Sequence, residues 1–164
     1  MSLTLQFCGF DSLVARTIER FTDPLGKIGH VDIVMPDGAL LGAQNEAGLG
    51  GKPSGVQIRP ASYVAAAGGN NIVRVTVPVT ADMQQKFYDF ALDQVGKPYD
   101  LTAIAAFVAG RDWRQPDSWF CSELAAASLE QGDVFPFPLF SPANKVTPAG
   151  LLLVVSAFGK VDAL

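Results

Sequence analysis

We expect the chain to be organised around the segment Ser118-Trp119-Phe120-Cys121-Ser122-Glu123-Leu124-Ala125-Ala126-Ala127. An aromatic pair precedes a cysteine, and the cysteine opens an alanine-rich segment that predicts a helix to about Gln131. Asp117 and Ser118 follow the helix-breaking Pro116, and both are residue types that favour a helix N-cap. We therefore expect Cys121 in the first helical turn, where free N–H groups and the helix dipole favour a thiolate.

The composition predicts a single globular domain over residues 1–164. Apolar residues make up 49% of the chain, which excludes the disordered class. The net charge of −4 disfavours a nucleic-acid partner, because phosphate binding needs a basic surface. With two cysteines, one histidine and no CxxC or HxxxH spacing, the sequence predicts no metal site and no cofactor.

The first seven residues lack the basic segment and the long apolar segment of a signal peptide. The apolar run at residues 151–155 is too short to cross a bilayer. We therefore expect a cytoplasmic protein with no transmembrane segment, or one released by cell lysis. The sequence leaves the oligomeric state open.

Alternating and β-branched residues predict the strands, and capping residues predict the helices. The predicted strands cover residues 3–8, 30–35, 39–44, 55–60 and 72–77. The predicted helices cover residues 11–21, 63–67, 80–95 and 101–109, besides the cysteine helix. Pro36, Asp37 and Gly38 supply the turn of a hairpin, and residues 45–55 form a glycine-rich loop.

A nucleophilic cysteine needs a base within hydrogen-bond reach, and this chain offers a single imidazole. His30 stands at the head of the second predicted strand, where alternation places it on one face with Asp32 and Val34. Gly29, directly before it, leaves space for another group to approach. A lone histidine is often structural, so His30 does not define a site by itself.

Five short pieces of the sequence occur in a fixed order. They are Gly29-His30-Val31-Asp32-Ile33-Val34, Leu41-Gly42-Ala43, Gly96-Lys97-Pro98-Tyr99-Asp100, Trp119-Phe120-Cys121-Ser122-Glu123-Leu124 and Thr147-Pro148. Together they resemble the circularly permuted branch of the NlpC-like, papain-fold superfamily, in which the histidine strand precedes the cysteine helix. The resemblance spans about residues 3–151. It implies an α+β fold, with an antiparallel sheet or partial barrel packed against helices and the Cys121 helix against the His30 strand.

The resemblance also implies a thiol hydrolase of the amidase or peptidase type, acting on a peptide or cell-wall-derived substrate through a thioester. Carried over by residue, Cys121 matches the nucleophile and His30 matches the general base. Tyr99 matches a tyrosine that lines the site. Asp32 and Trp119 are the other residues expected next to substrate, although Trp119 is also suited to packing that fixes Cys121.

The residue that should orient His30 is where the sequence departs from the family's pattern. The family often places a polar side chain on the next strand, where this chain has Gly42 or Ala43. Gln44 comes next and could accept from the imidazole through its amide oxygen. Asp32, on the same face as His30, is the second candidate, and Glu46 in the following loop is the third.

Two other functions stay open at this point. A lipid-directed acyltransferase or thioesterase, as in lecithin–retinol acyltransferase relatives of the same branch, would keep the Cys121 nucleophile and change the acceptor. A catalytically inactive binding or assembly module would keep only the fold. We expect Cys8 to be structural, unless it pairs with Cys121 in a disulfide, and Glu123 to be a surface or capping residue of the helix.

Overall fold

The computed structural model describes residues 1–10, 27–100, 117–135 and 146–164. The helices predicted at residues 11–21 and 101–109 lie outside these ranges. The described chain is α+β, as predicted, with a six-stranded antiparallel sheet. Its strands are β1 (Ser2–Gly9), β2 (His30–Val34), β3 (Leu40–Gln44), β4 (Gly55–Arg59), β5 (Asn70–Pro78) and β6 (Lys160–Ala163). The helices are α2 (Tyr63–Ala66), α3 (Ala81–Asp93), α5 (Cys121–Gln131) and α6 (Pro148–Ser156), with a 3₁₀ turn η1 (Leu49–Gly51).

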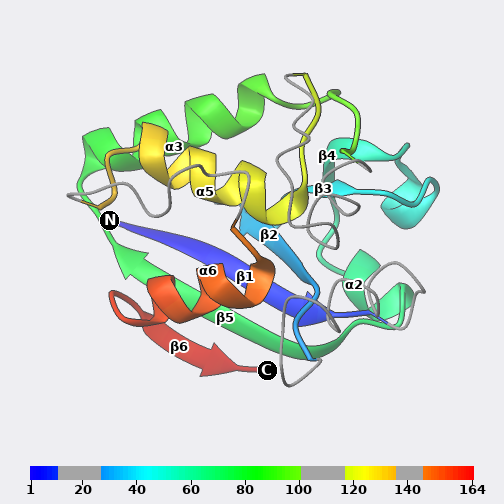
Figure 1. Cartoon of the computed structure of the whole chain (residues 1–164), viewed down its shortest axis with the longest axis horizontal. Coiled ribbons are helices and arrows are strands. Elements are labelled where there is room, and N and C mark those ends of the chain that lie inside the picture. Colours follow the sequence, from blue (N-terminus) through cyan, green and yellow to red (C-terminus); the bar gives the residue numbers. More distant parts are fainter. Residues whose placement is uncertain (11–26, 101–116, 136–145) are drawn as a thin grey trace.

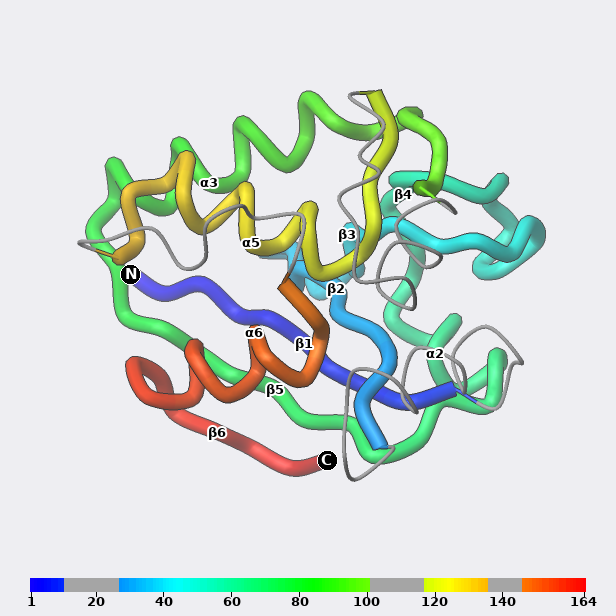
Figure 2. The backbone as a smooth tube through the Cα atoms, in the orientation of Figure 1, coloured from blue at the N-terminus to red at the C-terminus, as the bar shows by residue number. Residues whose placement is uncertain are grey.

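The sheet is open, and its strand order is β4-β3-β2-β1-β5-β6. β1 pairs with both β2 and β5, so it crosses the middle of the molecule (Figure 2). Its alternating apolar side chains Leu3, Leu5 and Phe7 are buried, which is the pattern of a strand with one face in the core. The hairpin between β2 and β3 turns at Gly38, whose φ of 86° favours glycine.

Three helices cover one face of the sheet. α3 and α5 run side by side, and α6 lies nearer the C-terminus (Figure 1). The main core forms between these helices and the inward side chains of the strands. It includes Phe87 from α3, Leu124 from α5 and Leu151 from α6. A smaller cluster containing Cys8, Leu40 and the α2 residues Tyr63 and Val64 packs separately. Within the described ranges, none of the helices has the length and apolar character needed to cross a membrane.

Side-chain caps fix the starts of α3 and α6. The Thr80 hydroxyl accepts from the Met83 amide at 3.3 Å, as the sequence predicts. The Thr147 hydroxyl accepts from the Gly150 amide at 3.0 Å. For the last apolar segment, which contains residues 151–155, the sequence predicts no helix or strand, whereas the structure has α6 there. Strand β6 is missed because its side chains are largely exposed on the edge of the sheet and show no buried alternation.

The cysteine helix begins later than its predicted cap. Asp117 and Ser118 are not the N-cap, because α5 begins at Cys121 and Phe120 occupies the cap position in an extended conformation. The reason is a backbone pairing just upstream. Trp119 donates to the Pro98 carbonyl at 3.1 Å and accepts from the Asp100 amide at 3.0 Å, which keeps the chain extended up to the cysteine. Cys121 is therefore the first residue of the helix.

The segment at residues 96–100 connects the cysteine helix to the sheet. On one side it pairs with the Trp119 backbone, and on the other it pairs with β4 through hydrogen bonds between Val56 and both Gly96 and Lys97. Gly55 has a φ of +97°, and a Cβ there would lie 2.3 Å from the Lys97 carbonyl oxygen. A glycine is therefore required for this close approach. The piece at residues 96–100 and the piece that contains Cys121 are thus neighbours in space.

Candidate active site

The two faces of β2 carry different side chains. Val31 and Ile33 point into the main core, and α5 packs against this strand. His30 and Asp32 take the other face, as alternation predicts, and they are only 4% and 1% exposed. A buried carboxylate and a buried imidazole are costly unless each is paired, so their partners define what this face can do.

Asp32 is the partner of the imidazole. Its Oδ1 lies 2.9 Å from Nε2 of His30. The neighbouring strand leaves room for this carboxylate, because a Cβ at Gly42 would lie 1.9 Å from Asp32 Oδ1. The missing side chain at Gly42 thus leaves the space that Asp32, from the histidine strand, occupies.

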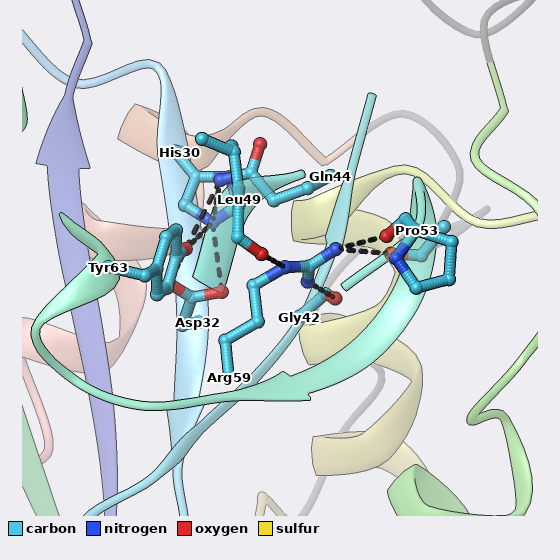
Figure 3. A network of polar contacts seen from close by, with 9 residues as sticks. His30, Asp32, Gly42, Gln44, Leu49, Pro53, Arg59 and Tyr63 are labelled. Carbon is cyan, nitrogen blue, oxygen red and sulfur yellow. Dashed lines mark hydrogen bonds and ion pairs between the residues drawn. The ribbon is translucent and has the colours of Figure 1, made fainter. Parts of the chain in front are cut away.

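Gln44 and Tyr63 complete the polar network around His30 (Figure 3). The Gln44 amide nitrogen lies 3.2 Å from His30 Nε2 and donates to the Tyr63 hydroxyl at 3.1 Å. The Tyr63 hydroxyl donates to Asp32 Oδ2 and lies 3.3 Å from Nε2. Gln44 therefore faces His30 with a donor rather than with the acceptor oxygen that the sequence-based hypothesis requires.

Charge in this network favours the imidazolium form of His30. Burial acts against a charged ring and would lower its pKa. The Asp32 carboxylate, the charge of Cys121 and hydrogen bonds to both side chains act in the opposite direction and raise the pKa of His30 to about 10. The ring is therefore protonated at neutral pH in this environment.

Cys121 is a further side chain that interacts with His30. Its thiol is buried at the first residue of α5, and α5 contacts both β2 and β3. Since Asp32 occupies Nε2, Nδ1 is the ring nitrogen available to the sulfur. The first helical hydrogen bond runs from the Leu124 amide to the Phe120 carbonyl, so the N–H groups of Cys121 and Ser122 have no partner within the helix. The structure thus brings the predicted nucleophile and the predicted base together.

Of the residues predicted to line the site, Tyr99 lies close to Cys121. Burial, followed by the charges of Cys121 and Asp100, raises the pKa of its phenol, which therefore stays neutral. Trp119 is directed toward α3 instead. Its indole N–H donates to Gln94 at 3.1 Å and its ring packs edge-on against Phe90. The position of Trp119 is that of a packing residue beside the nucleophile.

Sequence reasoning missed Arg59, which is 1% exposed at the end of β4. Its guanidinium donates to the carbonyls of Gly42 and Pro53 at 3.1 and 2.9 Å, and its Nε donates to the Leu49 carbonyl at 3.3 Å (Figure 3). It also lies 5.8 Å from the centre of the Tyr63 ring. Arg59 therefore ties the glycine-rich loop after Gln44 to the strands that hold the network.

Three other predicted residues have a clear position. Glu46 is exposed in the loop after β3 and lies outside the described contacts of His30. Glu123 is buried in the first turn of α5, so its prediction as a surface residue is wrong. Cys8 lies opposite His30 in the register of β1 and β2, and no disulfide joins it to Cys121.

In the part of the chain that the structure describes, no three His, Cys, Asp or Glu side chains form a group that could hold a metal ion. Comparison of the sequence with protein-family models and with curated proteins finds no match to either.

Proposed function

We propose that this protein is a cysteine hydrolase of the amidase or peptidase type, built on the circularly permuted NlpC-like papain fold. The observation that carries the proposal is the position of the chain's single imidazole. His30 interacts with the thiol of Cys121, which opens a helix, and its Nε2 pairs with the carboxylate of Asp32. A nucleophile next to a base, with a third group that orients the base, is the arrangement typical of thiol-based acyl transfer.

The proposed reaction starts from an ion pair. His30 already holds the proton taken from Cys121, and the charge of Asp32 stabilises this imidazolium. The thiolate attacks the carbonyl carbon of an amide, and the carbonyl π electrons move onto oxygen. The N–H group of Cys121, which has no partner within the helix, is suited to donate to that oxyanion, and the helix dipole adds a favourable potential.

The second half of the reaction returns the proton. The imidazolium of His30 protonates the leaving amine as the carbon–nitrogen bond breaks, which leaves a thioester on Cys121. Water then attacks the thioester, His30 accepts a proton from that water, and the acid product leaves with the thiol restored. Neutral Tyr99, close to Cys121, is positioned to contact the acyl group or its oxygen.

The assignment of the orienting role to Asp32 rather than Gln44 follows from charge and donor direction. A carboxylate accepts a hydrogen bond from Nε2–H and stabilises the imidazolium, whereas the Gln44 amide nitrogen is a donor. Gln44 then supports the network through the Tyr63 hydroxyl. This choice makes Gly42 part of the site, because any side chain there would displace Asp32.

Differential alkylation tests the proposal inside one molecule. Iodoacetamide at pH 6 should label Cys121 far faster than Cys8, since only Cys121 opens a helix and pairs with an imidazolium. Unfolding the chain in denaturant should equalise the two rates. Equal and slow labelling of both thiols in the folded protein would contradict the nucleophile assignment and favour the binding-module alternative.

Substrate class is tested separately. Peptidoglycan fragments and short peptides should release a new amino group, and the Cys121→Ala variant should release none. Acyl esters and phospholipids serve as the comparison. Turnover of lipid acyl groups without cleavage of any amide would instead support the acyltransferase or thioesterase alternative.

A further inference from the structure

Tyr63 lies at the centre of the polar network, although its sequence position gives no sign of it. The residue opens α2, a four-residue helix that follows β4. Its hydroxyl reaches Asp32 Oδ2, the Gln44 amide nitrogen and His30 Nε2 at the same time. All four side chains are buried, so water does not compete freely for these bonds.

The aromatic ring of Tyr63 is held on two sides. The Phe10 ring stacks against it with centroids 6.4 Å apart, and the Arg59 guanidinium lies 5.8 Å from its centroid. Phe10 also contacts the His30 ring at 5.5 Å. These contacts aim the hydroxyl at one point, because a tyrosine with a fixed ring has only its O–H rotation left.

The direction of the hydrogen bonds assigns the hydroxyl a single orientation. Asp32 is acceptor-only as a carboxylate, and the Gln44 nitrogen is a donor, so the Tyr63 proton must point to Asp32. Burial is the largest cause that raises the pKa of Tyr63, followed by the charge of Asp32. The phenol therefore keeps its proton at neutral pH.

On this basis, and resting on the proposed function, we propose that Tyr63 is a positioning residue that acts through Asp32. Its hydroxyl binds Oδ2, which leaves Oδ1 directed at His30 Nε2 and prevents the carboxylate from rotating away. The imidazole is then fixed with its other nitrogen toward Cys121. Tyr63 touches no reacting atom in this scheme.

The polar and charged groups around His30 come from several elements of the fold. They are Cys8 from β1, Asp32 from β2, Gln44 from β3, Tyr63 from α2 and Cys121 from α5, with the Arg59 cation of β4 behind Asp32 and Tyr63. Among these, only Tyr63 donates to the Oδ2 atom of Asp32 in the described contacts. Removal of its hydroxyl therefore removes the bond to Oδ2, together with its contacts to Gln44 and His30, and leaves the other groups in place.

The test is a double-mutant cycle with Tyr63→Phe and Asp32→Asn, read out as acylation of Cys121 by p-nitrophenyl acetate. Tyr63→Phe should lower the acylation rate by about three- to tenfold, the range expected for coupled neighbours. In the Asp32→Asn background the same change should have no further effect. Tyr88→Phe is the matched control, because its hydroxyl donates to the Val34 carbonyl outside the network, and it should leave the rate unchanged.

A spectroscopic readout separates positioning from a general loss of structure. The chain has one histidine, so ¹⁵N-histidine labelling gives a single Nε2–H signal. Tyr63→Phe should speed the exchange of this proton, and Tyr88→Phe should not. In the wild-type protein, a protected Tyr63 hydroxyl proton with a nuclear Overhauser effect to Nε2–H is expected, which keeps the test valid if Tyr63→Phe does not fold.

The proposal is overturned if Tyr63→Phe leaves rate and exchange unchanged, if its effect persists undiminished in the Asp32→Asn background, or if the wild-type hydroxyl shows no contact with Nε2–H. Failure of the proposed function looks different. In that case the wild-type protein shows the hydroxyl contact and the protected Nε2–H, but Cys121 is not acylated.

Discussion

The two faces of strand β2 show how five residues serve two purposes. On one face, Val31 and Ile33 are fully buried in the main core beneath α5, where only shape and apolar area matter. On the other face, His30 and Asp32 are buried just as deeply, but each has a charged or hydrogen-bonding partner. The comparison shows that burial alone does not distinguish core from site. The directed polar contacts do.

The largest effect on reactivity is expected from the polar face. Asp32→Asn keeps the size of the side chain but removes the charge that stabilises the His30 imidazolium. We expect acylation of Cys121 by p-nitrophenyl acetate to fall by about 10²-fold or more, the range of general acid–base contributions. Asp37→Asn in the exposed β2–β3 turn is the control. A fall of less than threefold would assign the orienting role elsewhere.

The next largest effect should come from the strand opposite. Gly42→Ala places a methyl group 1.9 Å from the present position of Asp32 Oδ1, so the carboxylate must move away from His30. We expect acylation to fall by about tenfold, an effect of the size seen for other coupled neighbours. Gly38→Ala meets nothing within 4 Å, but its φ of +86° strains a side chain. Gly38→Ala should lose stability and keep its acylation rate. The steric account would be contradicted if Gly38→Ala lost acylation while Gly42→Ala kept it.

The polar face should also give stability a pH dependence. The His30 pKa is raised from 6.5 to about 10 in the folded protein. A raised pKa means that the folded state binds the proton more tightly, so the ion pair contributes fully below pH 6.5 and is lost as pH rises through about 10. Urea unfolding at pH 6 and pH 10.5 should show this loss in the wild-type protein. Asp32→Asn should reduce the difference, and an unchanged difference would place its origin in other groups.

The smallest effect on reactivity is expected from the apolar face. Ile33→Val removes one methylene from the core and should cost about 1 kcal/mol of the free energy of unfolding. The acylation rate of the folded protein should stay within a factor of two of the wild-type rate. Urea unfolding and acylation on the same sample test both statements. A large loss of acylation would show that the two faces are not independent.

Much of this architecture is predictable because its signals are local. Alternation of apolar side chains identifies β1, β-branched residues identify β5, a threonine cap identifies the start of α3, and alternation again places Asp32 beside His30. The sequence places the cap of α5 too early, because the interaction that delays the helix is not local in sequence. Backbone pairing of Trp119 with residues 98 and 100 keeps the chain extended where its own sequence permits a cap.

The unpredicted part of the site depends on contacts distant in sequence. Tyr63 lies 31 residues from Asp32, in a helix too short to carry a periodic signal. Arg59 looks like an ordinary strand residue until its carbonyl partners at residues 42, 49 and 53 are seen. The lack of a side chain at Gly42 leaves space for another group. Only the register across β2 and β3 shows that this group is Asp32.

The central claim is that the single imidazole is held as a cation between Asp32 and Cys121. A ¹⁵N NMR titration of His30 in the wild-type protein measures this directly, because no second histidine contributes a signal. The ring should stay doubly protonated through neutral pH and lose its proton near pH 10, and Asp32→Asn should bring that midpoint down. Titration of the wild-type ring at or below pH 6.5 would contradict the account.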